Sequence, residues 1–511
     1  MRFIKRPSLV RGNTSVPVWS GLSLAGITLA CVLSACGGDD DQAEEPKWAQ
    51  TWSVAPAYAP AMPATPLRYF PNVAAQSTGI TAPGIALTAP LTPPADTTNT
   101  ATLFSNTTIR QFVRVSVGGP AVRLRLANGY GASDVVISDM RVALADKAAC
   151  PAANPVVAPA TEALGVTCSN IMGSTTQPVT VGGTTAFTIP AGKDIYSDAI
   201  KLAVPNQAFV AVSFYVKDLT PPLNTHGSAN ATTYLVTGLP GTTANFTAAS
   251  VFNDATLNGT AALATGSSNL VVSGIDTMVP PSTRVIIAFG DSITDGGNIL
   301  KDTATRWADA LANRFIAAAP SGKTPAVVSS VGIDGNRVLT ETTNGVLGLA
   351  GIKRFKVDVL DRSGVTDVIV LQGVNDLHVS AGETAERIIG GYQDLIAQAH
   401  AKKLKIYFAT ITPFRTDVGV DTTVYGSHCR NVTDCANMEA VRLATNDWIL
   451  STKEHDGAID FNGAVAPAGR TNVMKAEWNL QLTTGGRDQI HPNKYGLSAM
   501  ADSVNLTWFG Q

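Results

Sequence analysis

The sequence has little charge and almost no excess of either sign. Of its 511 residues only 15% are charged, and the formal net charge at pH 7 is −2. Nucleic acids and anionic headgroups are normally bound by a basic surface, which this composition does not supply. We therefore expect no nucleic-acid partner. Hydrophobic residues make up 45% of the chain and Gly and Pro are abundant, which is typical of an exported globular protein that contains β-structure.

Cysteines are also scarce, with six in the chain, two of them near the N-terminus. A chain of this length buries a core of ordinary size, so its folding needs no disulfide scaffold. The other four cysteines fall in two local pairs, for which we predict the disulfides Cys150–Cys168 and Cys429–Cys435. Four cysteines allow three connectivities, and the sequence does not choose among them. Zinc is the weaker interpretation, because there is no C-x-x-C pair and no histidine at zinc-site spacing nearby.

The apolar stretch near the N-terminus, residues 21–33, is too short for a comfortable membrane span. A basic region precedes it, and Leu33-Ser34-Ala35-Cys36 closes it with small residues before a cysteine. This pattern resembles the bacterial lipoprotein signal. The resemblance implies removal of residues 1–35, lipidation of Cys36 and a membrane anchor in the cell envelope, with Gly37 favouring the outer membrane. An ordinary cleaved signal and release from the cell is the alternative.

Composition divides the next part of the chain in two. Residues 36–105 begin as a polar tether and continue rich in Pro, Ala and Thr, so regular structure is not expected through most of them, although islands such as residues 48–52 could dock on a domain. From 106 to 276 the pattern changes to period two, with β-branched and aromatic residues between Gly, Pro and Asn. Many short strands of this kind predict an all-β, sandwich-like accessory domain.

The pattern changes again for residues 281–511. Short apolar runs alternate with amphipathic helical stretches, as in the run 285–289 and the helix that carries Trp307, Leu311 and Phe315. Alternating strand and helix predict an α/β domain with a parallel sheet covered on both faces. Reactive groups collect at the carboxyl ends of the strands in such sheets.

Four polar segments follow the predicted strands or lie near the end of the chain, at residues 290–293, 332–337, 373–376 and 488–493. A serine hydroxyl becomes a nucleophile when a base removes its proton, and imidazole suits that role near neutral pH. His491 is the candidate base, and Asp488 lies three residues earlier, where one turn can bring its carboxylate to the second imidazole nitrogen. The tetrahedral oxyanion needs donors, for which glycine backbone and an Asn amide are suited.

Together and in this order the four segments resemble the four blocks of the GDSL or SGNH hydrolase family, in its arylesterase and carbohydrate-esterase branch. The resemblance covers residues 284–511 and implies a three-layer α/β/α, flavodoxin-like fold. It implies that Ser292 is the nucleophile and that Asp488 and His491 complete the triad. It also implies an oxyanion hole, whose donors are Ser292 N–H, Gly335 N–H and the Asn375 side chain. Ser330 stands where relatives usually carry Asn.

Each of these residues also has a plainer interpretation. Ser292 could be a helix N-cap, and Asp488 and His491 could be a surface pair. The sequence around Ser292 lacks the G-x-S-x-G elbow of the α/β-hydrolase fold, so that fold is disfavoured. We interpret Asp291 as a structural cap, and His226 and the other histidines as solvated or packed, with His378 as a candidate for the substrate pocket.

The function that follows is hydrolysis of carboxylic esters through an acyl-enzyme, without metal or cofactor, by a protein that we expect to be monomeric. The resemblance favours short acyl, acetyl or aryl esters, some attached to a polymer. One alternative is a lipase or polyester hydrolase for longer acyl chains. A second, from another class, is a catalytically inactive surface binding protein on a hydrolase scaffold.

Overall fold

The computed structural model describes residues 45–59, 107–148, 169–217, 223–227, 229–237, 262–266, 268–297, 299, 302–341, 347–379, 383–414, 432–481 and 487–510. All of them belong to one compact unit, Glu44–Gln511. The predicted signal peptide and Cys36 lie outside the described residues, so export, lipidation and the membrane anchor stay predictions. In the part of the chain that is described, no helix combines the length and the apolar character needed to cross a bilayer.

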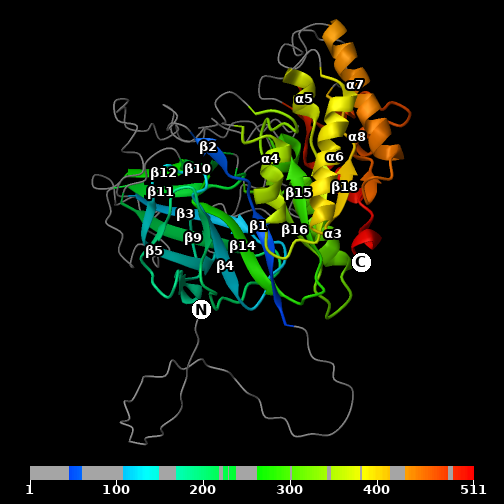
Figure 1. Ribbon diagram of the computed structural model, residues 1–511. Coiled ribbons are helices and arrows are strands. Elements are labelled where there is room, and N and C mark those ends of the chain that lie inside the picture. The colour runs from blue at the N-terminus through cyan, green and yellow to red at the C-terminus, as the bar shows by residue number, and fades with distance from the viewer. Residues whose placement is uncertain are drawn as a thin grey trace, which may run out of the picture. The chain divides into compact units, whose positions relative to one another are not determined.

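Residues 47–279, here called the β-rich region, build antiparallel sheets from short strands (Figure 1). The described strands are ordered β1-β14-β4-β8, β13-β10-β2 and β12-β11-β3-β9-β5-β6, with β7 paired to β5. Their bounds are β1 (Lys47–Ser53), β2 (Ala57–Ala59), β3 (Thr107–Arg114), β4 (Val122–Ala127), β5 (Val135–Leu144), β6 (Gln177–Pro178), β7 (Phe187–Ile189), β8 (Asp194–Tyr196), β9 (Phe209–Val216), β10 (Leu223–His226), β11 (Thr233–Thr237), β12 (Ala262–Gly266), β13 (Asn269–Leu270) and β14 (Val272–Val279). A 3₁₀ turn spans Gly173–Thr175.

The two larger sheets of the β-rich region share one apolar core. Leu124 of β4 and Ile275 of β14 belong to the same buried cluster as Ile109 of β3, Met140 of β5 and Val212 of β9. Two antiparallel sheets that bury their inner faces against each other form a sandwich-like arrangement. The prediction of β-structure from the period-two pattern is thus confirmed.

The segment expected to be mainly a tether supplies two of these strands. β1 pairs antiparallel with β14, and Trp52 at its end is buried in the core of the sandwich. The island around Trp48 and Trp52, which the sequence analysis named as able to dock, forms the strand Lys47–Ser53. The rest of the Pro-rich stretch, from residue 60 to 106, lies outside the described residues.

Residues 285–510, here called the α/β region, alternate strands and helices. The parallel sheet contains β15 (Val285–Gly290), β16 (Val327–Gly332), β17 (Asp367–Leu371), β18 (Lys405–Ala409) and β19 (Gly457–Ile459), and a small antiparallel pair contains β20 (Asn479–Gln481) and β21 (Arg487–Pro492). The described helices are α2 (Ser292–Asp295), α3 (Trp307–Ala318), α4 (Gly351–Phe355) with the π-helix Lys356–Leu360, α5 (Val374–Val379), α6 (Ala385–Ala401), α7 (Val432–Ser451), α8 (Phe461–Val465) and α9 (Lys494–Asp502), with 3₁₀ turns at Ala476–Trp478 and Leu506–Phe509.

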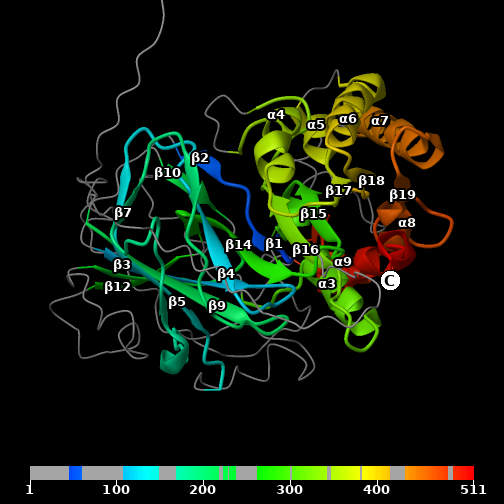
Figure 2. The ribbon, with the colours of Figure 1, turned by 60° about the horizontal axis from the view of Figure 1, so that its bottom comes forward.

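The order of the parallel sheet, β16-β15-β17-β18-β19, is that of a doubly wound, flavodoxin-like fold. Figure 2 shows α4, α6 and α7 on one face of this sheet and α3 and α9 on the other. The predicted three-layer domain with a parallel sheet is confirmed. In this strand order the switch point lies at β15, because its neighbours β16 and β17 continue the sheet in opposite directions.

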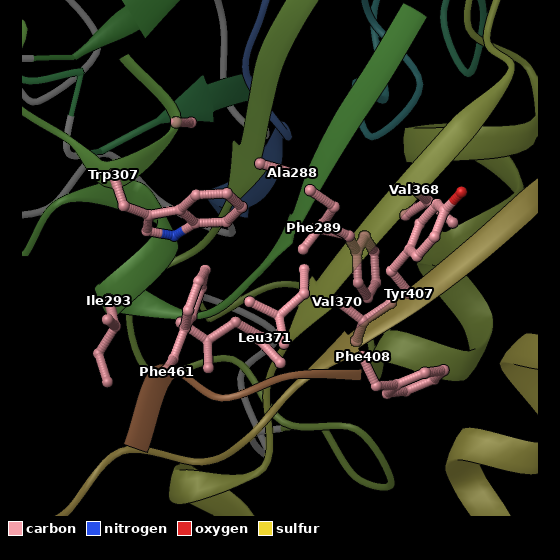
Figure 3. Packing of buried hydrophobic residues seen from close by; sticks show 14 of the residues in the cluster. Ala288, Phe289, Ile293, Trp307, Val368, Val370, Leu371, Tyr407, Phe408 and Phe461 are labelled. Atoms are coloured by element: carbon pink, nitrogen blue, oxygen red, sulfur yellow. The ribbon is translucent and has the colours of Figure 1, made fainter. Parts of the chain in front are cut away.

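The sequence of β15 is a continuous apolar run because both faces of this strand are buried. All six of its residues are buried, and Figure 3 shows Phe289 beside Val370 of the neighbouring strand β17, with Phe408 of β18 beyond it. On the opposite face Trp307 packs edge-on against Phe461, with ring centroids 5.2 Å apart. The strand that leads to the candidate nucleophile is thereby held rigidly.

The β-rich and α/β regions meet along β16, the edge strand of the parallel sheet. Strand β1 lies against β16, and Ser53 Oγ donates a hydrogen bond of 3.0 Å to the Ser330 carbonyl. Ser116 Oγ accepts a bond of 3.3 Å from Val328 N–H. Since residues 44–511 group as one compact unit, the predicted domain boundary between 276 and 281 stays a prediction.

Candidate active site

Ser292 lies immediately beyond the carboxyl end of β15, as the first residue of the one-turn helix α2. Gly290 ends the strand where a Cβ atom would stand 2.1 Å from the Leu371 carbonyl oxygen, so only glycine fits there. Asp291 caps α2 by accepting a bond of 3.0 Å from Ile293 N–H, which confirms its structural interpretation. Burial raises the pKa of Asp291 to about 7.

The structure brings Ser292 together with His491 and Asp488. His491 Nε2 lies 2.8 Å from Ser292 Oγ, and His491 Nδ1 lies 2.8 Å from Asp488 Oδ1. Asp488 also accepts bonds from the backbone N–H groups of Ile490 and His491. Between them Gln489 adopts φ 71°, in the left-handed region, which folds the chain back so that the carboxylate reaches the imidazole. A hydroxyl, an imidazole and a carboxylate are thus in line, the arrangement that nucleophilic catalysis by serine requires.

The electrostatics of this pair favour an imidazolium. Burial alone would lower the pKa of His491, but the charge and hydrogen bond of Asp488 outweigh it and raise that pKa to about 9. Burial would likewise raise the pKa of Asp488, yet the His491 charge and the hydrogen bonds that the carboxylate accepts hold it well below its ordinary value. Asp488 therefore stays ionised throughout the neutral range while His491 is an imidazolium.

The two other predicted oxyanion residues lie on neighbouring segments of the same sheet edge. Gly335 follows β16 with φ 69°, and Asn375 stands in the first turn of α5, just after β17. The Asn375 amide donates a bond of 3.0 Å to the carbonyl of Asn336. The side chain of Asp376 accepts bonds from the N–H groups of Val338 and Leu339, which fixes the second segment against the third.

Arg354 is a buried cation that the sequence analysis missed. Its guanidinium donates to the Gly290 carbonyl at 2.7 Å, the Val331 carbonyl at 2.9 Å and Asn336 Oδ1 at 2.8 Å, and it pairs with Asp358. It therefore ties the ends of β15 and β16 to the segment after Gly335. Only the i,i+4 spacing of Arg354 and Asp358 hints at this role, and that spacing is equally common on exposed helices.

Two more residues beside Ser292 were not predicted. At Gly297 a Cβ atom would stand 3.0 Å from His491 Nε2 and 3.1 Å from the Ser292 Cβ, so the site has no room for a side chain there. His226, which we expected to be solvated or packed, is buried and its Nε2 lies 3.0 Å from Asp295 Oδ1. His378, a candidate for the pocket, stacks edge-on against Phe414.

The predicted disulfides lie only partly within the described residues. Cys435 is disulfide-bonded, while Cys150, Cys168 and Cys429 lie outside the described residues, so both pairings stay predictions. Where the structure is described, no three His, Cys, Asp or Glu side chains gather closely enough to hold a metal ion.

A parallel α/β fold with a Ser-His-Asp arrangement at its switch point is the framework of a serine hydrolase. Residues 288–498 match the family model of the GDSL-like Lipase/Acylhydrolase family. This part of the chain is therefore similar to that family, in agreement with the resemblance seen in the sequence.

Solved structures and curated proteins complete the comparison. A carbohydrate acetylesterase from Sinorhizobium meliloti is 16% identical, with 43% of this chain and 95% of that chain covered and a TM-score of 0.31. A GDSL-like lipase from Bacteroides thetaiotaomicron is 14% identical, with 44% and 86% covered and a TM-score of 0.29. The search of curated proteins found no match.

Proposed function

We propose that the protein hydrolyses carboxylic esters through an acyl-enzyme on Ser292. The observation that carries this proposal is the unbroken line of contacts from Ser292 Oγ through His491 to Asp488, at 2.8 Å for each step. The match of residues 288–498 to an acylhydrolase family model supports the same class of reaction. This line of contacts favours catalysis over binding on an inactive scaffold.

In the first half of the reaction Ser292 Oγ attacks the ester carbonyl and its proton passes to His491 Nε2. The oxyanion that forms accepts hydrogen bonds from the backbone N–H groups of Ser292 and Gly335 and from the Asn375 amide. Asp488 stabilises the imidazolium, which then donates its proton to the departing alcohol as the C–O bond breaks. An acyl-enzyme and a free alcohol result.

In the second half a water molecule gives a proton to His491 and attacks the acyl carbon. The tetrahedral intermediate collapses, His491 returns the proton to Ser292 Oγ and the carboxylic acid leaves. Neither half requires an oxidant, a reductant or a metal ion.

We propose further that short acyl groups are preferred. Ser292 is only 8% exposed, and the Gly297 backbone lies so close to the triad that an added Cβ atom would stand 3.0 Å from His491 Nε2, so the surroundings of the nucleophile are crowded. The kcat/KM for p-nitrophenyl acetate should exceed that for p-nitrophenyl palmitate by about tenfold or more, since one methylene misplaced in a tight pocket already costs about tenfold. Faster cleavage of palmitate would instead favour the lipase alternative, and no cleavage of any ester in a wide screen would overturn the proposed function.

The role proposed for Asn375 has its own test. Asn375→Ala should lower kcat by about 10²- to 10³-fold, the usual effect of losing one oxyanion donor. Because the amide also holds the Asn336 carbonyl, the melting temperature must be measured alongside. A rise in KM with unchanged kcat would make Asn375 a substrate-binding residue instead.

A further inference from the structure

Two side chains of the β-rich region contact the α2 turn, which carries Ser292. His226, at the end of β10, places Nε2 at 3.0 Å from Asp295 Oδ1, and Asn230 Nδ2 donates a bond of 2.6 Å to the Asp295 carbonyl. Both contacts cross from one region to the other, and His226 and Asp295 are each only 3% exposed in their side chains. Water therefore competes little for the His226–Asp295 contact.

The other imidazole nitrogen fixes the protonation of His226. Its Nδ1 lies 2.9 Å from the Ala55 carbonyl, an oxygen that can only accept, so Nδ1 carries a proton. The contact between Nε2 and Asp295 then needs one further proton, which lies between the imidazole and the carboxylate. In either position of this proton the two side chains are held together by a hydrogen bond.

Asp295 is rigidly connected to Ser292 through the backbone. Asp295 N–H donates to the Asp291 carbonyl at 2.9 Å, and the N–H groups of Gly296 and Gly297 donate to the Ser292 carbonyl at 2.8 and 2.6 Å. A single helical turn is unstable by itself, because forming it fixes several residues for very few hydrogen bonds. Its geometry is therefore set by its anchors, and a shift of Asp295 moves Ser292 relative to His491.

We propose that His226 is a positioning residue for the nucleophile. Through Asp295 it holds the α2 turn in the orientation that keeps Ser292 Oγ at 2.8 Å from His491 Nε2. The β-rich region is then part of the catalytic apparatus rather than a spacer or a substrate-binding accessory. The inference rests on the proposed esterase function, and it concerns a residue that does not touch the substrate.

Two substitutions at the same position separate the contacts of the imidazole. In His226→Asn the amide nitrogen stands where Nδ1 stood, so the bond to Ala55 is kept and the bond to Asp295 is lost. In His226→Gln the longer side chain reaches as far as Nε2, so a donor to Asp295 is kept. We expect His226→Asn to lower kcat by about 10- to 100-fold, with KM changed by less than about threefold, because small displacements of reacting groups cost that much. His226→Gln should retain kcat within about fivefold.

A control for simple destabilisation is Val212→Ala in the core of the β-rich region, where Val212 is fully buried. This substitution should lower the melting temperature and leave kcat within about twofold. The rate at which a fluorophosphonate labels Ser292 gives a second readout, which should fall in parallel with kcat in His226→Asn.

The outcomes separate the two proposals. If both His226 variants lose melting temperature but keep the wild-type kcat and labelling rate, the contact is structural and the inference is overturned while the esterase function stands. Equal losses of kcat in His226→Asn and His226→Gln also overturn it, since the retained donor would then be irrelevant. Wild-type protein that neither cleaves esters nor reacts with the fluorophosphonate overturns the proposed function and the inference with it.

Discussion

Ser292→Ala is expected to lower kcat for ester hydrolysis by about 10⁴- to 10⁶-fold, as removal of the nucleophile does in related catalytic arrangements. The residual rate should come from the oxyanion donors and substrate binding alone. The alanine fits the space of the serine, and the cap of α2 is supplied by Asp291 rather than by Ser292, so the fold should persist. Steady-state kinetics with an aryl acetate measure kcat, and circular dichroism measures whether the fold persists.

A matched control for this variant is Ser451→Ala. Ser451 ends α7, is exposed and donates only to backbone carbonyls of its own helix, so its loss should leave kcat unchanged. If Ser292→Ala kept most of the activity while Ser451→Ala behaved as the wild type, Ser292 could not be the nucleophile.

Asp488→Asn should cause the second largest loss, about 10⁴-fold in kcat near neutral pH, because the amide no longer stabilises the imidazolium and favours the wrong tautomer of His491. Asparagine has nearly the same shape as aspartate, so the contacts of the chain around Gln489 should be largely kept. Single-turnover rates on an aryl acetate would separate a slower acylation from slower release of the acid.

The wild type and Asp488→Asn should also differ in the pH dependence of kcat/KM. In the wild type His491 must lose its proton to act as a base, and Asp488 raises its pKa to about 9, so kcat/KM should rise with pH from neutral toward that value. Without the Asp488 charge, burial opposes only the smaller effects of Asp334 and Asp291, so the apparent pKa should fall well below its wild-type value. A rising limb that stayed in place in Asp488→Asn would mean that this limb does not report on His491.

Local sequence patterns were sufficient for much of the fold and for the positions of the site residues. The apolar run of β15 and the fourfold spacing of Trp307, Leu311 and Phe315 depend only on neighbours a few residues away. The three side chains that meet at the candidate site could also be selected, because Asp488 and His491 lie three residues apart and Ser292 stands in a recognisable segment.

What the sequence could not predict are contacts between distant segments. His226 and Asp295 are 69 residues apart, and nothing near His226 marks it as the partner of a buried carboxylate. Arg354 resembles a surface arginine until the strand ends that it contacts are folded around it. The sequence marked residues 48–52 as able to dock, but it could not name their partner β14, which lies more than two hundred residues later.

The serine contacts along β16 cover the edge strand of the parallel sheet. An edge strand presents unpaired N–H and C=O groups on which another chain can add a strand, and many sheets prevent this with charged side chains or proline. Here Ser116 Oγ instead accepts a hydrogen bond from the Val328 N–H, and Ser53 Oγ donates one to the Ser330 carbonyl. A fragment beginning at residue 281 would lack both hydroxyls and expose this edge, so it should form aggregates that light scattering detects while the full chain does not. Cover for this edge thus comes from residues that precede the α/β region in the chain.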